Sequence, residues 1–388
     1  MKKIILLDID GVLVKPGGYR AAVRGVMEYF SGLMGIEPPV VSDSVLNGFE
    51  ARGITSEWDM LPLLIAALWQ EILTPYAEIP LPNDLRDAAA VIGRLAVRDC
   101  FSSLEVPDVD LTLHPYPAEA ALRQGLFPAI PQHLREQLLR HTRDPYCSVT
   151  TRLFQQFVLG SEQFAKTYQL TPDVICESYL KKFDQSLLTQ EVQEEIERLS
   201  QREDLYLGSI TARPSLPPRE VRPAPLAYPP EAEMALEAIG FPAMTVIGFG
   251  KLKYVGERFG LDPEVLLKPS AVQALAAIAA LICGEEFSAI EQAVNWQKNG
   301  ELNGILACVP AEFELHVVED TLGGVRSVRA ASRLLAEKGV GVRVQAWGLT
   351  GDNREKTRVM EAEGVKCFPD WGALLAATRN FDCVQGED

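Results

Sequence analysis

The stretch IILLDIDGVL, residues 4–13, places two carboxylates directly after a short apolar run. The run predicts a strand that is buried on both faces, because it has no polar side to turn toward water. Asp8 and Asp10 are two residues apart, so their side chains point the same way in an extended chain. Two like charges this close need a cation or a shared proton. Ligands of open α/β sheets bind at the carboxyl ends of strands, so the stretch predicts a functional site.

The composition is that of a soluble globular protein. The chain has 388 residues, of which 47% are hydrophobic and 23% are charged. This length predicts two or three domains, one of which can be an insertion. The formal charge of -16 argues against nucleic acid or an anionic membrane as the main partner. It does not argue against a small anionic substrate, because a bound metal can reverse the local sign.

The cysteines and the apolar segments indicate the cellular compartment of the protein and whether it contacts a membrane. Seven cysteines with no C-x-x-C pair predict reduced thiols and a cytoplasmic protein. The apolar start of the chain ends at Asp8, too early for a signal peptide. Residues 271–282 are apolar but too few to cross a bilayer. We therefore expect no membrane contact.

The spacing of apolar residues divides the chain into two kinds of segment. Residues 17–184 show helical spacing and no convincing strand, and within them residues 81–147 are irregular and rich in proline. From Thr189 onward, strands and helices alternate, which predicts a parallel sheet with helices on both faces. The first strand belongs with this second half. The helical block is therefore expected to be an insertion after strand one.

Later in the chain, a hydroxyl group stands at the end of one predicted strand and an ammonium group stands just before a predicted helix. The sequence T-A-R-P places Thr211 at the end of a predicted strand, with Ser209 two residues earlier as the alternative. A Lys-Pro pair places Lys268 just before a predicted helix, and Lys251 and Lys253 are its competitors. Both groups suit the binding of phosphoryl oxygens.

Two further carboxylates end the most apolar of the late strands. Glu319 and Asp320 stand in HVVEDTLGGVRS, residues 316–327. Asp320 can also be read as the N-cap of the helix that follows. Taken with the other strand ends, these carboxylates complete a set of groups that phosphoryl transfer through a metal requires.

The ordered motifs resemble those of the haloacid dehalogenase superfamily of phosphohydrolases. D-x-D-G-V-L is similar to its first motif, T-x-R-P to its second, Lys-Pro to its third and E-D-T-x-x-G-V to its fourth. The resemblance implies an α/β fold with a Rossmann-like core, a parallel sheet and an all-helical cap. It implies a core of residues 1–14 and 188–388 and a cap of residues 15–187.

The resemblance also implies catalytic roles. Asp8 would be the nucleophile that forms an aspartyl-phosphate, and Asp10 would be the general acid and base. Thr211 and Lys268 would bind the phosphoryl oxygens. Tyr19 and Arg20, just after the first motif, are candidates for substrate contact.

The implied cofactor is Mg²⁺. Its ligands would be Asp8, the backbone carbonyl of Asp10, Asp320 and, as a second carboxylate from the same strand end, Glu319. The later acidic residue of many superfamily members is replaced here by Gly323 and Gly324.

The implied activity is that of a Mg²⁺-dependent phosphatase acting on a small phosphorylated metabolite. A sugar-phosphate mutase uses the same core, and so does a phosphonate hydrolase, which would need a cap lysine. A non-catalytic binding or regulatory module is a further alternative, favoured slightly by the long cap and by the Pro-rich loop at residues 214–230. The sequence defines neither the metabolite nor the oligomeric state.

Overall fold

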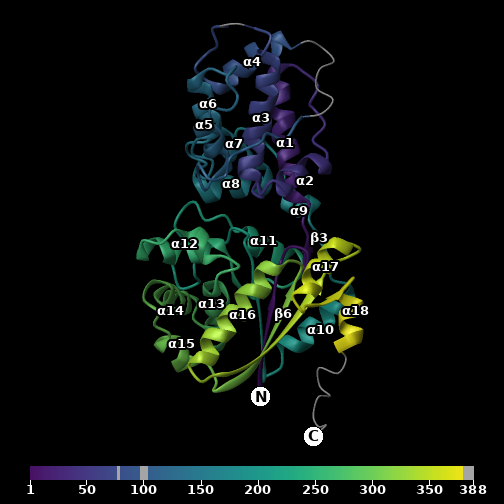
Figure 1. The fold of residues 1–388 in the computed structure, drawn as a ribbon, viewed down its shortest axis with the longest axis vertical. Coiled ribbons are helices and arrows are strands. Elements are labelled where there is room, and N and C mark those ends of the chain that lie inside the picture. The colour runs from purple at the N-terminus through teal and green to yellow at the C-terminus, as the bar shows by residue number, and fades with distance from the viewer. Residues whose placement is uncertain (77–78, 97–103, 379–388) are drawn as a thin grey trace. The chain divides into compact units, whose positions relative to one another are not determined.

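The computed structural model describes residues 1–76, 79–96 and 104–378. The chain divides into two compact units, a core unit of Met1–Pro16 with Asp184–Asp388 and a helical unit of Gly17–Phe183 (Figure 1). The divisions expected from sequence were at residues 14/15 and 187/188. Residues 77–78 and 97–103 of the expected cap, and 379–388 of the expected core, lie outside the described residues.

The core unit contains a six-stranded sheet in the order β5-β4-β1-β6-β7-β8, and every neighbouring pair is parallel. The strands are β1 (Lys2–Leu7), β4 (Leu205–Ile210), β5 (Thr245–Ile247), β6 (Glu312–Glu319), β7 (Gly341–Leu349) and β8 (Lys366–Phe368). A separate antiparallel pair, β2 (Val14–Lys15) with β3 (Gln185–Ser186), joins the two chain segments that border the helical unit. The α/β fold with a parallel sheet, predicted from sequence, is confirmed.

Helices cover both faces of this sheet (Figure 1). They are α10 (Gln190–Ser200), α11 (Glu231–Ala238), α12 (Phe249–Gly256), α13 (Ala271–Cys283), α14 (Glu286–Asn299), α15 (Asn303–Cys308), α16 (Leu322–Glu337), α17 (Arg354–Ala362) and α18 (Trp371–Thr378), with short 3₁₀ turns at Glu257–Phe259 and Pro263–Leu266. Side chains of β1 alternate between two apolar clusters. Ile4 and Leu6 pack with α13 and α16 on one face, and Ile5 and Leu7 pack with α10, α11 and α18 on the other. β1 is therefore buried on both faces, as its apolar run predicts.

Every secondary-structure element described in the helical unit is a helix. They are α1 (Gly18–Met34), α2 (Asp43–Ala51), α3 (Glu57–Leu73), α4 (Leu85–Leu95), α5 (Pro117–Gln124), α6 (Gln132–Leu139), α7 (Val149–Leu159), α8 (Ser161–Tyr168) and α9 (Tyr179–Phe183). The expectation that residues 81–147 are irregular is wrong, because α4, α5 and α6 lie there. Two prolines of this stretch stand at helix starts, Pro117 in the first turn of α5 and Pro131 as the N-cap of α6. Proline is tolerated there because the first backbone N–H groups of a helix have no partner within the helix.

Two of the cysteines depart from the sequence expectation. Cys283, at the end of α13, and Cys308, at the end of α15, form a disulfide across 25 residues of chain. The expectation of reduced thiols is wrong for this pair, because α13 and α15 bring their last residues together although the sequence shows no C-x-x-C spacing. Cys147, Cys176 and Cys367 are free thiols.

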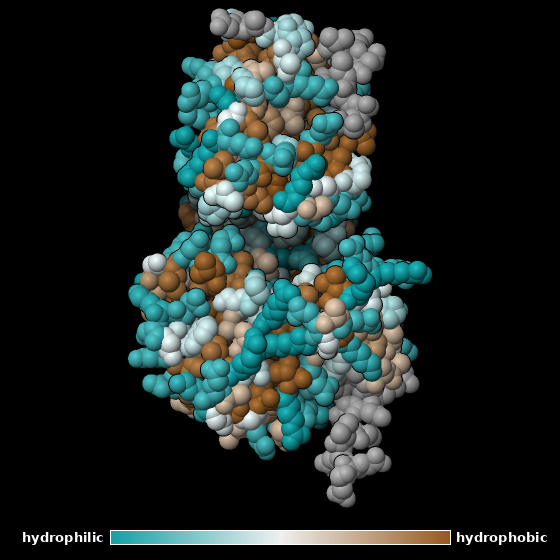
Figure 2. All heavy atoms as spheres, in the orientation of Figure 1, coloured by the Kyte–Doolittle hydropathy of each residue, from teal (hydrophilic) through white to brown (hydrophobic). Residues whose placement is uncertain are grey.

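The visible surface mixes hydrophilic and hydrophobic residues over both units (Figure 2). Scattered exposed apolar side chains of this kind are ordinary on folded proteins. Across the described ranges, no helix combines the length and the apolar character that a bilayer crossing needs.

Candidate functional site

The topology brings the ends of β1 and β6 together. β1 lies between β4 and β6, and Leu7 is level with Ser209 on one side and with Val318 on the other. The backbone N–H of Asp8 donates to the carbonyl of Val318 at 3.1 Å, which extends this pairing by one residue. From β1 the chain proceeds to β4 on one side and later returns to β6 on the other. Such a switch point is where open α/β sheets bind ligands.

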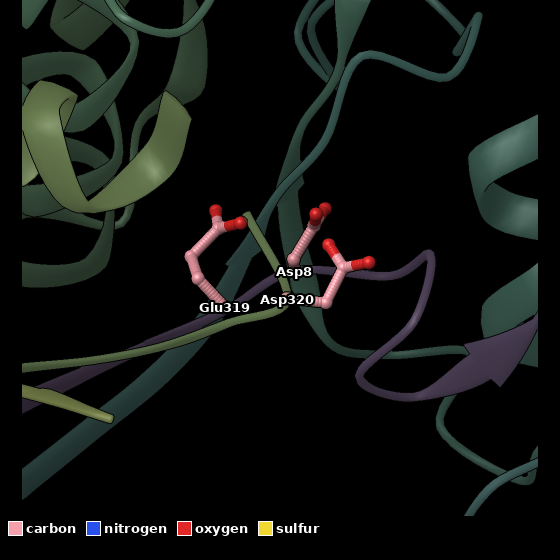
Figure 3. A group of neighbouring side chains, drawn as sticks. All are labelled: Asp8, Glu319 and Asp320. Atoms are coloured by element: carbon pink, nitrogen blue, oxygen red, sulfur yellow. The ribbon is translucent and has the colours of Figure 1, made fainter. Parts of the chain in front are cut away.

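Three carboxylates converge at this edge. Ligand oxygens of Asp8, Glu319 and Asp320 all lie within 4.8 Å of one another (Figure 3). Asp8 and Glu319 are buried, and Asp320 is half-buried. Figure 3 shows Asp8 at the end of β1, with Glu319 and Asp320 following from the end of β6. The predicted strand ends therefore meet in space.

Lys268 lies between two of these carboxylates. Its Nζ is 2.9 Å from Asp8 Oδ2 and 2.9 Å from Glu319 Oε1. Burial alone would lower the pKa of the Lys268 ammonium, but the charges of Asp8 and Glu319 and its hydrogen bonds to them together raise it. The side chain is therefore a fixed positive charge beside Asp8. Its competitor Lys251 is buried elsewhere, in an ion pair with Glu286.

The cluster carries more negative charge than Lys268 offsets. Burial raises the pKa of Asp8, and the charges of Asp320 and Asp10 raise it further, against the opposing effect of Lys268. Burial also raises the pKa of Glu319 well above its ordinary value, and the neighbouring charge of Asp8 adds to this. An additional cation would relieve both effects.

The donor set fits a hard divalent cation. Glu319 Oε2 is buried, and no described residue gives it a hydrogen bond. A buried carboxylate oxygen without a donor requires an explanation, and an ion is one of the usual ones. The three converging side chains offer only oxygen, which suits Mg²⁺ rather than metals that favour nitrogen or sulfur ligands.

Two glycines allow the chain to pass close to these carboxylates. Gly11 has a φ of +76°, and a Cβ there would lie 2.3 Å from Asp320 Oδ2. Gly324, in the first turn of α16, would place a Cβ 1.6 Å from Glu319 Oε1. Both carboxylates are thus held against backbone that no larger residue could form. Gly324 thereby provides the space that the Glu319 carboxylate occupies.

The two candidate hydroxyls at the end of β4 have different surroundings. Thr211 follows the strand, is buried, and its Oγ1 accepts a hydrogen bond from the backbone N–H of Arg213 at 3.2 Å. Ser209 lies within the strand, and its buried Oγ has no hydrogen-bond partner among the described residues. The hydroxyl of Thr211 keeps its own proton to donate, so it is suited to a phosphoryl oxygen. Its role stays a prediction.

The side chain of Asp10 lies outside the carboxylate cluster. Arg213 Nε is 3.1 Å from Asp10 Oδ1 and 2.9 Å from Oδ2, and Arg213 Nη2 is 2.5 Å from Oδ1. The Asp10 carboxylate is therefore held by Arg213, and the binding of a metal by the Asp10 backbone carbonyl stays a prediction.

Tyr19 and Arg20 belong to the helical unit. Tyr19 stacks on Phe154 with ring centroids 6.4 Å apart. Arg20 is held by acidic and amide side chains of α2, at 2.8 Å from Glu50 and 2.8 Å from Asn47. These contacts show what orders the two side chains, and their contact with a substrate stays a prediction.

Sequence reasoning missed three side chains that hold the site. One of them is Gln273 in α13, which is fully buried. Its Nε2 donates to the carbonyls of Thr211 and Ile247, and its Oε1 accepts from the backbone N–H of Lys268. Gln273 therefore connects three segments of the chain. A lone glutamine in an alanine-rich helix, at Lys268 plus five, was the available signal.

The other two are basic residues. Lys356, in α17, places its Nζ 2.6 Å from Asp320 Oδ2. Arg213 is part of the T-x-R-P motif itself, so the motif contained it without indicating its partner Asp10.

Comparison with known proteins gives the fold but not the family. No protein-family model matches the chain, and no curated protein matches it in sequence. The X-ray structure of Northeast Structural Genomics Consortium target ZR25 is similar with a TM-score of 0.65 and 16% identity, over 98% of this chain and 99% of that one. At this identity the likeness shows the fold alone. Phosphatase Tt82 from Thermococcus thioreducens aligns over 92% of this chain and 99% of its own at 16% identity, with a TM-score of 0.43 that is too low to carry an argument.

Proposed function

We propose that this chain is a Mg²⁺-dependent phosphatase of the haloacid dehalogenase type, a phosphoric monoester hydrolase that acts on a small phosphorylated metabolite. One observation carries the proposal. A buried Asp8 at the end of the central strand is flanked within hydrogen-bonding distance by a buried ammonium and lies in a cluster with two further carboxylates. A nucleophile, a cation for the phosphoryl group and oxygen ligands for a metal are thereby supplied at one edge of the sheet.

In the first half-reaction an oxygen of Asp8 attacks phosphorus, and the bond from phosphorus to the leaving oxygen breaks. Asp10 donates its proton to that oxygen. Lys268 already contacts Asp8 at 2.9 Å and stays beside the phosphoryl group as it transfers. The hydroxyl of Thr211 contacts another phosphoryl oxygen. The product of this step is an aspartyl-phosphate.

In the second half-reaction a water attacks phosphorus and gives its proton to Asp10. The bond between phosphorus and Asp8 breaks, which releases inorganic phosphate and restores the Asp8 carboxylate. Mg²⁺ would be held by Asp8, Asp320 and Glu319, with the backbone carbonyl of Asp10 as a further candidate ligand, and it would neutralise charge on the phosphoryl group.

The test is phosphate release by the purified protein from a generic aryl phosphate and from a panel of phosphorylated metabolites, with Mg²⁺ and with a chelator. We expect activity only with Mg²⁺, and none in Asp8→Asn, because no neighbouring group replaces the nucleophile. The matched control is Asp204→Asn, which changes a carboxylate just before β4 and hence at the opposite edge of the sheet. Turnover by Asp8→Asn at the wild-type rate would refute the covalent mechanism. Phosphonate cleavage or phosphoryl transfer between sugars without phosphate release would favour the other activities of this core.

A further inference from the structure

Arg213 joins two carboxylates that are far apart in the sequence. It contacts both oxygens of Asp10 through Nε and Nη2, and its Nη2 also lies 2.8 Å from Asp184 Oδ2. A planar guanidinium that binds two oxygens of one carboxylate fixes the orientation of that carboxylate as well as its position.

The three side chains differ strongly in exposure. The side chain of Arg213 is 1% exposed and that of Asp184 is 7% exposed, whereas that of Asp10 is 34% exposed. A buried guanidinium has to keep a partner, because an uncompensated buried charge is strongly destabilising. Asp184 is the buried partner, and it holds the guanidinium in place while Nε and Nη2 orient the more exposed Asp10 carboxylate.

Both carboxylates lie on the short segments that connect the core unit to the helical unit. Asp184 begins the second segment of the core unit and immediately precedes β3. Asp10 forms a bridge with Val14, the first residue of β2, and β2 pairs with β3. The chain leaves and re-enters the core through these two segments. The backbone of Asp10 contacts them through its bridge to Val14, and its side chain is connected to Asp184 through Arg213.

We propose that Arg213 is a positioning residue that orients Asp10 and ties that orientation to Asp184. The inference rests on the proposed phosphatase function, in which Asp10 protonates the leaving oxygen. Asp10 has to point its carboxyl toward that oxygen, and a misplacement of about 1 Å at such a group lowers rates by up to about 10²-fold. Arg213 itself contacts no reacting atom in this scheme.

The experiment compares two substrates that differ in their need for a general acid. A simple alkyl phosphate has a poor leaving group that must be protonated, and dinitrophenyl phosphate has a good one that need not be. The quantity measured is kcat/KM, because it reports the steps up to cleavage of the leaving group and excludes the later hydrolysis of the aspartyl-phosphate. The proteins are the full-length wild type, Arg213→Met, Arg213→Lys and Asp184→Asn.

We expect Arg213→Met to lower kcat/KM for the alkyl phosphate by about 10–100-fold and to leave that for dinitrophenyl phosphate within about 3-fold. Arg213→Lys keeps the positive charge but not the bidentate contact with Asp10, so its kcat/KM for the alkyl phosphate should lie between those of Arg213→Met and the wild type. Asp184→Asn should lower the alkyl rate alone, and by less. If Arg213→Met does not fold, as judged by its thermal melt, the other two variants carry the test. The matched control is Arg202→Met, which breaks an ion pair with Asp204 and should change neither rate.

Equal losses on both substrates would show that Arg213 does not act through protonation of the leaving group, and this would overturn the inference while leaving the phosphatase function intact. Failure of the wild type to hydrolyse any phosphate ester with Mg²⁺ would overturn the proposed function and this inference together. The two failures are therefore distinguishable in one set of measurements.

Discussion

Replacing Glu319 by glutamine separates what this side chain does for folding from what it does for a metal. Glutamine keeps the shape and an oxygen that accepts a hydrogen bond from Lys268, but it removes a fully buried negative charge. Burial and the charge of Asp8 raise the pKa of Glu319 well above its ordinary value. A carboxyl with a higher pKa in the folded state than in the unfolded state favours unfolding at every pH above its unfolded value. In the metal-free protein, the charge of Glu319 is therefore expected to be destabilising.

We expect Glu319→Gln to be more stable than the wild type by about 1–3 kcal/mol at pH 8 in the presence of a chelator, the scale of the cost of a buried polar atom without a partner such as Glu319 Oε2. Lys268 keeps Asp8 as its ionic partner in the variant, so no buried ammonium is left uncompensated. For a folding unit of about 200 residues this gain in stability is a rise in melting temperature of about 3–10 °C. The difference should shrink toward pH 4.5, the ordinary pKa of a glutamate, because the wild-type carboxyl is then increasingly protonated in both states. The control is Glu312→Gln, an exposed carboxylate at the start of the same strand, which should change stability by less than about 0.5 kcal/mol.

Mg²⁺ should reverse the order of the two proteins. Binding to the folded state alone stabilises in proportion to the logarithm of ligand concentration over Kd. The wild type should gain more melting temperature across a Mg²⁺ titration, because the variant lacks one of the charged oxygens. A variant that is less stable than the wild type at pH 8 in chelator would show that the attraction between Lys268 and Glu319 exceeds the desolvation of the carboxylate, and the reasoning would be wrong.

Three further substitutions test groups around the site and in the sheet. Gln273→Leu should lower the free energy of unfolding by about 2–4 kcal/mol in a denaturant titration, because it leaves buried backbone groups without partners; an unchanged midpoint would contradict the bridging role. Lys356→Met should tighten Mg²⁺ binding by about 2–5-fold in calorimetry, since Asp320 no longer has to release an ammonium, and weaker binding would contradict this. Burial lowers the pKa of His316 to about 4 in the folded protein, whereas the pKa in the unfolded chain is near 6.5. The unfolded chain therefore binds a proton first, and the wild type should lose ~2–3 kcal/mol of stability as pH falls from 7 to 4.5. His316→Phe should lack that loss, and an equal slope in both proteins would contradict it.

Local patterns were sufficient to predict the sheet and the position of its candidate site. The apolar run before Asp8 and the one before Glu319 each identify a strand by composition alone, because strands buried on both faces carry few polar residues. Once the strands are parallel and neighbouring, their carboxyl ends must lie at the same edge. The meeting of Asp8 with Asp320 therefore follows from topology and needs no knowledge of side-chain contacts.

Side chains that arrive from helices could not be predicted in the same way. Gln273 and Lys356 reach the site only because α13 and α17 pack at particular distances and rotations against the sheet. Those variables depend on the whole apolar interface of each helix, which no window of local sequence contains. The disulfide between Cys283 and Cys308 was missed for the same reason, since it joins the ends of two helices.

The case of Lys268 shows how the two kinds of information combine. A Lys-Pro pair is common, and in sequence Lys268 was preferred over its competitors Lys251 and Lys253 without knowledge of the partner that each lysine finds. What distinguishes the two lysines is the partner that each one finds. Lys251 is buried in an ion pair with Glu286 of α14, whereas Lys268 contacts two carboxylates that β1 and β6 had already placed side by side. A buried ammonium is held most firmly where the negative charge is most concentrated. The same convergence of carboxylates that predicts a metal therefore also selects which lysine lies beside the nucleophile.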